Sequence, residues 1–132
     1  YYRDVPEMRR LLDRVAKFEI PTGCRKIAPT STRLEGVEGF YESRVRVGFF
    51  GRYNLDKGFD NFRLLVEMFE GDDVFFVSAG VGDIARPVSK RYRDLGWRSD
   101  MPTLLAAVDI VVVPNNVAYF DLIILEALSV GK

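Results

Sequence analysis

The sequence predicts an α/β fold in which helices flank a Rossmann-like, doubly wound parallel sheet. Short apolar segments that end in glycine or proline alternate with segments of helical spacing along residues 44–132. The apolar segments are nearly continuous, as expected of strands that are buried on both faces. Distinctive polar residues follow the carboxyl ends of these strands, which is where open parallel sheets bind ligands.

Four strands and three helices are predicted in this region. The strands, each followed by a loop or a terminating residue, are 45–50, 74–79, 88–92 and 110–113. The helices are 59–69, 102–107 and 121–130. Gly71 stops the first helix, and Pro114 terminates the last strand because it cannot continue a hydrogen-bond ladder.

Residues 1–43 have a different pattern. Asp4 and Pro6 indicate a helix start, and the next turns have one apolar stripe. Glycine and proline then recur, and only residues 25–28 can pair as a short strand. We therefore predict an N-terminal helix and interdomain connector, followed by the Rossmann-like domain over 44–132.

Composition excludes several classes of function. The 132 residues include 19 basic and 19 acidic side chains, so the chain lacks the net positive field that nucleic acids attract. The single cysteine, Cys24, cannot form an internal disulfide. Histidine is absent, which excludes a Ser-His-Asp triad, a Cys-His pair and a His-ligated metal within this chain. No apolar run reaches the roughly 18 residues that span a bilayer, and we expect a cytoplasmic location.

The loop after the first strand has the composition of an anion site. It reads GRYNLDKG over residues 51–58 and directly precedes a helix. A diphosphate requires close backbone approach, positive charge and N–H donors. Gly51, the cations Arg52 and Lys57, and the helix N-terminus provide these. The alternative is a solvated turn with two surface cations.

Two further loops follow predicted strands. Gly80 and Gly82 allow a ligand to approach the backbone after the second strand, although such a G-x-G is common in ordinary turns. The loop after Pro114 opens an apolar helix with a single carboxylate, Glu126, which is costly there unless it is paired, hydrogen-bonded or exposed. The alternative is that Glu126 lies on a solvated helix stripe.

A basic run lies between the second and last strands. Its members are Arg86, Lys90, Arg91, Arg93 and Arg98. Such a run attracts phosphorylated ligands or the anionic head groups of a membrane surface, so peripheral membrane contact is one expectation. The alternative is a solvated edge of the sheet. We expect Trp97, next to this run, to pack against the domain.

Four segments share their order and motifs with a known family. They are 47–58 (VGFFGRYNLDKG), 77–83 (VSAGVGD), 95–100 (LGWRSD) and 104–131 (LLAAVDIVVVPNNVAYFDLIILEALSVG). Together they resemble the C-terminal, donor-binding domain of GT-B glycosyltransferases, in the large group 1 family of retaining enzymes that includes sucrose and glycogen synthases. The combination is more specific than any single motif.

The resemblance implies roles for particular residues. Arg52 and Lys57 would hold the donor diphosphate, Gly51 and Gly58 would shape their loop, and Glu126 would bind ribose hydroxyls; Arg52, Lys57 and Glu126 form the implied catalytic set. Backbone groups at residues 97–99 would meet the nucleotide base. The other implied donor-binding positions are Gly80, Gly82, Trp97, Arg98, Phe120, Asp121 and Leu122.

The resemblance also implies the reaction. A glycosyl group would pass from a UDP-, GDP- or ADP-sugar to an acceptor with retention of configuration, without a cofactor or a metal ion. The acceptor would bind a separate N-terminal domain that is missing from this chain, and the donor domain would be cut short at its C-terminal end. This chain alone is therefore expected to be inactive.

The sequence departs from the family pattern before the last helix. Residue 118 is alanine where the family has a glutamate that contacts the donor sugar. The family's Gly-Phe-Gly reads Tyr-Phe-Asp over residues 119–121, so Asp121 places a carboxylate near the positive end of a helix. It would act there as an N-cap or as a repulsive neighbour of phosphate.

These departures leave two interpretations. One is a subfamily with a rearranged donor contact, which the retention of Arg52, Lys57 and Glu126 favours. The other is a non-catalytic nucleotide-binding or scaffold module derived from a glycosyltransferase. In Ala118→Glu, a gain in donor affinity would support degeneration and a loss would support a working variant site. A dinucleotide oxidoreductase is disfavoured because no G-x-G-x-x-G follows the first strand.

Overall fold

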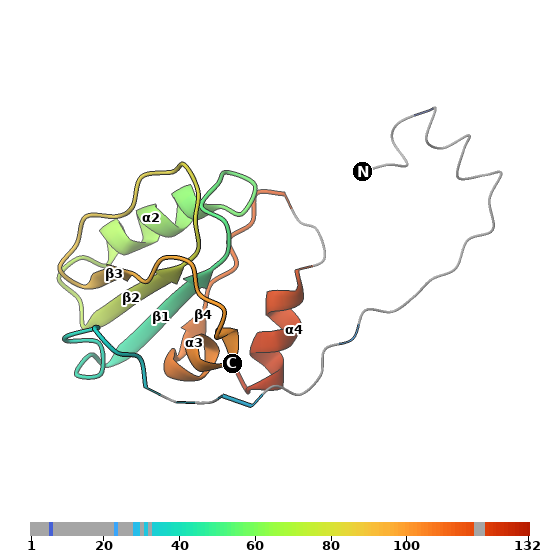
Figure 1. Ribbon diagram of the computed structural model, residues 1–132. Coiled ribbons are helices and arrows are strands. Elements are labelled where there is room, and N and C mark those ends of the chain that lie inside the picture. The colour runs from blue at the N-terminus through green and yellow to red at the C-terminus, as the bar shows by residue number, and fades with distance from the viewer. Residues whose placement is uncertain (1–5, 7–22, 24–27, 30, 32, 118–120) are drawn as a thin grey trace.

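The computed structural model describes residues 6, 23, 28–29, 31, 33–117 and 121–132 (Figure 1). The elements run in the order β1 (Val45–Phe50), α2 (Phe59–Met68), β2 (Val74–Ala79), β3 (Tyr92–Asp94), α3 (Met101–Ala107), β4 (Ile110–Val111) and α4 (Leu122–Ser129). Apart from residues 6 and 28, the predicted N-terminal helix and the strand predicted at 25–28 lie outside the described residues.

The four strands form one parallel sheet in the order β3-β2-β1-β4. β1 is central: it pairs with β2 from Val45↔Val74 to Phe50↔Ala79, and with β4 on its other side. The chain thus builds outward from β1 through β2 and β3 and then crosses to the opposite side for β4. This reversal is the switch point of a doubly wound sheet, and it confirms the predicted fold class.

Helices cover the two faces of the sheet (Figure 1). Successive strand residues point to opposite faces, so β1 directs Phe49 toward α2 and Phe50 toward the other layer. On the α2 face, Phe49 packs against Phe62 with ring centroids 5.2 Å apart. On the opposite face, Leu104 of α3 and Ala127 of α4 join the core. Packed side chains on both faces of the sheet therefore hold the carboxyl ends of the strands in place.

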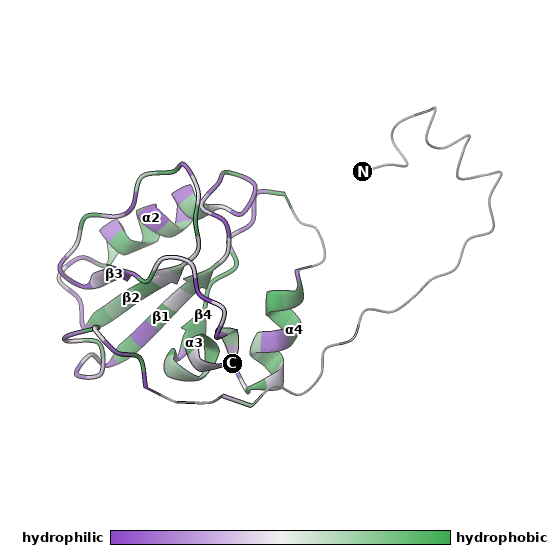
Figure 2. Ribbon diagram, in the orientation of Figure 1, coloured by the Kyte–Doolittle hydropathy of each residue, from purple (hydrophilic) through white to green (hydrophobic). Residues whose placement is uncertain are grey.

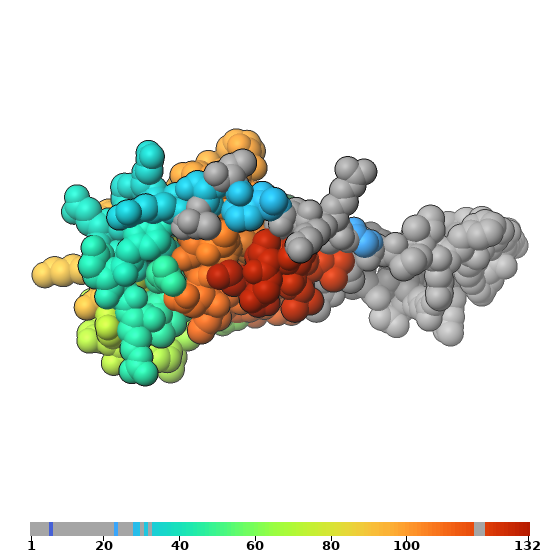
Figure 3. Space-filling view, turned by 90° about the horizontal axis from the view of Figure 1, so that it is seen from below, coloured from blue at the N-terminus to red at the C-terminus, as the bar shows by residue number. Residues whose placement is uncertain are grey.

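The end of the predicted connector also packs on the domain. Leu34, Val37 and Phe40 are buried in the same cluster as α3 and α4, and the Phe40 ring meets Phe75 edge-on at 5.6 Å. Figure 3 shows this segment lying over α3 and beside α4. The division at residue 43 stays a prediction, and the connector contributes core side chains just before it.

Two strand predictions were wrong in their bounds. β3 begins at Tyr92 and not at residue 88, because Val88 is 92% exposed and the ladder to β2 is formed around the buried Tyr92. β4 ends at Val111 and not at residue 113, although Val112 N–H still donates to the Gly48 carbonyl at 2.9 Å. Within the described residues β4 lies at an edge of the sheet and pairs only with β1, at Val47↔Ile110 and Gly48↔Val111.

Candidate functional site

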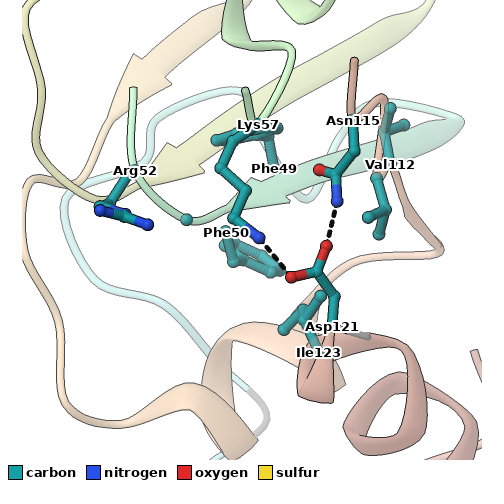
Figure 4. A pocket seen from close by; sticks show the side chains of 10 residues that line it. Phe49, Phe50, Arg52, Lys57, Val112, Asn115, Asp121 and Ile123 are labelled. Carbon is teal, nitrogen blue, oxygen red and sulfur yellow. Dashed lines mark hydrogen bonds and ion pairs between the residues drawn. The ribbon is translucent and has the colours of Figure 1, made fainter. Parts of the chain in front are cut away.

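A cavity of about 270 Å³ opens at the carboxyl end of β1 (Figure 4). It lies between the loop 51–58 and the N-terminal end of α4. Its lining residues are Phe49, Phe50, Gly51, Arg52, Lys57, Val112, Val113, Asn115, Asp121 and Ile123. Because β1 and β4 are neighbours in the sheet, residues some 60 positions apart in the sequence meet here, at the switch point of the sheet.

Glycines allow the loops around this cavity to touch. Gly58 has a φ of +66°, and a Cβ there would lie 1.8 Å from the Pro114 carbonyl oxygen. A Cβ on Gly80 would lie 1.8 Å from the Gly51 carbonyl oxygen, and one on Gly82 would lie 2.3 Å from that of Tyr53. The atoms that approach Gly80 and Gly82 are therefore backbone atoms of the loop 51–58; contact of these two glycines with a ligand stays a prediction.

Asn116 fastens the loop 51–58 to the loop after β4. Its side-chain N–H₂ donates to the Leu55 carbonyl at 2.7 Å, and its side-chain oxygen accepts from Asn61 at 2.9 Å. The N–H groups of Asn116 and Val117 both donate to the Asp56 carbonyl. This contact was not predicted from the sequence. The local feature that indicates such a contact is the Asn115-Asn116 pair, because asparagine side chains in loops often form hydrogen bonds with backbone groups.

Lys57 and Arg52, the two cations predicted to bind phosphate, both line this cavity but differ in their partners. The Lys57 ammonium forms an ion pair with Asp121, and the second oxygen of that carboxylate accepts from the Asn115 amide (Figure 4). The Arg52 side chain is exposed at the cavity, without an ion pair or hydrogen bond to any described residue. One cation is therefore neutralised and the other is available to an anion.

Asp121 occupies the N-cap position of α4 but does not cap the helix with its side chain. The N-cap interpretation is thus correct for its position and wrong for its carboxylate, which turns to Lys57 and Asn115 instead. The first N–H groups of α4 therefore receive no bond from the Asp121 side chain, and the positive end of the helix lies beside the cavity.

Glu126 is half-buried on α4 and lies outside the cavity lining. Its carboxylate has no hydrogen bond or ion pair within the described part of the chain. It follows the cavity-lining Ile123 by three residues, so the two share a side of the helix. The helix is otherwise apolar, with one hydrophilic band (Figure 2), and Leu122 is exposed. Phe120 and Ala118 lie outside the described residues.

The segment predicted to meet the nucleotide base, and the basic run beside it, differ from expectation at Trp97. Trp97 is 71% exposed, so the expectation that it packs against the domain was wrong. Arg98, beside it, pairs with Asp100 at 2.5 Å. Arg86 and Arg91 pair with Asp94 and Asp73 at 3.0 and 3.3 Å, so carboxylates neutralise much of the basic run locally. Membrane contact stays a prediction.

A buried hydroxyl network fixes the loop 51–58 to β2 and β3. The Tyr53 hydroxyl donates to Asp94 at 2.7 Å and lies 3.0 Å from the Ser78 hydroxyl. Arg86 stacks over the Tyr53 ring, 4.7 Å from its centre, and donates to the second Asp94 oxygen at 3.0 Å. Burial raises the pKa of Tyr53, so its hydroxyl remains a donor. Neighbouring Tyr92, also buried, has its pKa raised to about 12.

Asp94→Asn is expected to lower stability at neutral pH and to matter less in acid. Burial alone raises the pKa of the Asp94 carboxyl, but hydrogen bonds from Tyr53, the Gly96 N–H and Arg86 lower it more, so the net pKa is below its ordinary value. A carboxyl with a lowered folded-state pKa stabilises the fold above its unfolded pKa of about 4, and this contribution is lost as pH falls through the folded value. The urea midpoint of the variant should be below wild type at pH 7, with a smaller gap at pH 3.

Asp83→Asn is the matched control, since Asp83 is exposed and has no side-chain partner within the described residues. It should leave the urea midpoint unchanged at both pH values. A gap between Asp94→Asn and wild type that is equal at pH 7 and pH 3 would show that the carboxylate charge does not stabilise the network.

Comparisons with known proteins support the fold. No protein-family model matches the chain, and no curated protein matches it at a significant level. The solved structure of Alr3699/HepE from Anabaena, in complex with UDP and glucose, is similar with a TM-score of 0.57 and 23% sequence identity. The match covers 68% of this chain and 28% of that chain, so it spans less than a third of the solved protein. At this identity the similarity establishes the fold.

Two observations concern the described residues alone. None of their helices combines the length and apolar character that crossing a membrane requires. No three His, Cys, Asp or Glu side chains among them gather closely enough to hold a metal ion. The expectation of a reaction without metal or cofactor stays a prediction.

Proposed function

We propose that this chain is the donor-binding part of a retaining GT-B glycosyltransferase, and that its cavity binds the diphosphate of a nucleotide-sugar. The observation that carries the proposal is the meeting of Arg52, Lys57 and the N-terminus of α4 around one cavity at the switch point of the sheet. Positive charge and N–H donors together are what a diphosphate requires. UDP and glucose, which accompany the similar structure, make UDP-sugars the first donors to test.

The cavity suits the electrostatics of glycosyl transfer. The reaction breaks the bond between the anomeric carbon of the sugar and a phosphate oxygen, and the electron pair moves onto the diphosphate. Arg52, Lys57 and the dipole of α4 would stabilise that growing negative charge. The acceptor hydroxyl would attack the anomeric carbon on the face that the diphosphate leaves, and its proton would pass to the departing phosphate. Because attack and departure take place on the same face, the anomeric configuration is retained. A separate domain would supply the acceptor.

Binding of nucleoside diphosphates tests the proposal without requiring turnover. The purified protein is titrated in a calorimeter with UDP, GDP, ADP and UMP. We expect at least one diphosphate to bind, and UDP to bind more tightly than UMP, because the second phosphate adds charge-assisted hydrogen bonds. Absence of heat and of saturation with all three diphosphates would contradict the proposed function.

Glu126→Gln is expected to weaken nucleotide binding while leaving binding of inorganic pyrophosphate unchanged. A carboxylate accepts strong hydrogen bonds from two ribose hydroxyls, and the amide accepts weaker ones. We expect a loss of about fivefold to tenfold in UDP affinity, measured by calorimetry. Glu70→Gln, the same change at an exposed position after α2, is the control and should bind both ligands as wild type does. An equal loss for UDP and pyrophosphate would contradict a ribose contact.

A further inference from the structure

The carboxylate of Asp121 lies among the donor groups that line the cavity. Lys57 and Asn115 each contact one oxygen of Asp121, so both oxygens are engaged by donors that line the cavity (Figure 4). The side chains of Lys57 and Asp121 are only 22% and 13% exposed, and the ion pair is therefore largely shielded from solvent. These donors are the ones that an incoming phosphate group needs.

Asp121 is held in this position although its own helix offers it another. An aspartate at an N-cap ordinarily accepts from the N–H of the second or third helical residue, here Ile123 or Ile124. No such side-chain bond is present in α4, which has eight residues. The carboxylate is therefore held by the cavity-lining donors Lys57 and Asn115 and not by its own helix.

We propose that Asp121 is an internal counter-anion that competes with the phosphate groups of the ligand for Lys57 and Asn115. The proposal rests on the proposed function, because it describes how the same cavity accepts its ligand. A carboxylate and a phosphate repel each other at contact distance, so the ligand binds only when Asp121 moves away from Lys57. The side chain then turns away from Lys57 and Asn115 and leaves both donors, and the N-terminus of α4, to the phosphate.

Competition with Asp121 favours ligands that carry more than one negative charge. A diphosphate brings at least two negative charges and several acceptor oxygens. It therefore gains more than a single carboxylate does from Lys57, Asn115 and Arg52, which has no partner among the described residues. A monoanion has no such advantage over Asp121 and should not displace it. The contact thus keeps the cavity closed to common monoanions and opens it to polyphosphates.

The test is the affinity for inorganic pyrophosphate and for UDP in three proteins: wild type, Asp121→Asn and Asp72→Asn. Asparagine keeps the shape of aspartate and removes the competing charge. Asp72 is exposed just before β2, at the amino-terminal ends of the strands and thus away from the cavity, and has no side-chain partner within the described residues. Calorimetry at constant ionic strength without divalent cations measures the affinities, and circular dichroism verifies that each variant is folded.

We expect Asp121→Asn to bind pyrophosphate and UDP about three- to tenfold more tightly than wild type, and Asp72→Asn to bind as wild type does. Unchanged or weaker pyrophosphate binding by Asp121→Asn, in a protein whose wild type binds UDP, overturns the counter-anion and leaves nucleotide binding intact. An equal gain in Asp72→Asn overturns it as well, because the effect is then one of net charge.

The same titrations separate this proposal from the proposed function. Tighter pyrophosphate binding by Asp121→Asn, with no UDP binding by any of the three proteins, supports the counter-anion and contradicts nucleotide binding. If neither wild type nor Asp121→Asn binds either ligand, both proposals are overturned.

Discussion

Gly58→Ala is expected to destabilise the fold by roughly 3 to 5 kcal/mol, which is a large fraction of the stability of a small domain. Gly58 has a φ of +66°, and a Cβ would come within 1.8 Å of the Pro114 carbonyl oxygen. The left-handed backbone alone costs about 1 to 2 kcal/mol for a residue with a Cβ. The clash adds the cost of separating the loops 51–58 and 114–117. Chemical unfolding of variant and wild type measures the difference.

Gly96→Ala is a control with nearly the same backbone conformation. Gly96 has a φ of +65°, but no heavy atom lies within 4 Å of the position that its Cβ would take. This variant should lose only the backbone contribution, about 1 to 2 kcal/mol. If both variants lose the same amount, the contact between Gly58 and Pro114 does not hold the loops together.

Replacing the cations of the cavity should have the largest effect on ligand binding. We expect Arg52→Ala and Lys57→Ala each to weaken UDP and pyrophosphate binding by about ten- to a hundredfold, because each removes a charge-assisted hydrogen bond to phosphate. The effect should be greater for the double variant. Calorimetric titration gives the affinities.

Arg93→Ala is the matched control for Arg52→Ala. Arg93 lies in β3, is exposed, and has no ion pair or hydrogen bond of its side chain to any described residue. The variant has the same change of net charge and should bind both ligands as wild type does. If Arg52→Ala binds UDP as tightly as Arg93→Ala does, Arg52 has no specific role in holding phosphate.

The strands and helices that the sequence predicts best are those with a continuous apolar run and a clear stop. β1 and β2 match their predicted bounds, and α2 ends within a residue of its prediction. β3 was misplaced because the residue that pairs and packs is Tyr92, whose hydroxyl needs the buried Ser78 as a partner. Such a polar partner in the core does not follow from apolar spacing.

The sequence indicated which loops form the candidate site, but not which side chains of those loops contact one another. The composition of loop 51–58 and its place after a buried strand indicated Arg52 and Lys57. The Lys57–Asp121 ion pair joins residues 64 positions apart, and nothing in the local sequence of either indicates the other. The Asn115-Asn116 pair indicates a polar loop contact, but not its partner, because Leu55 lies 61 positions away. Contacts between loops depend on the strand order, which sets the neighbours.

We propose that a nucleoside diphosphate binds at the carboxyl end of β1, between the loop 51–58 and α4. The most direct test is amide chemical-shift mapping by two-dimensional NMR of the ¹⁵N-labelled protein during titration with UDP. We expect saturable shifts that are largest at residues 51–58 and 121–126. Absence of shifts, or shifts confined to other parts of the sheet, would contradict it.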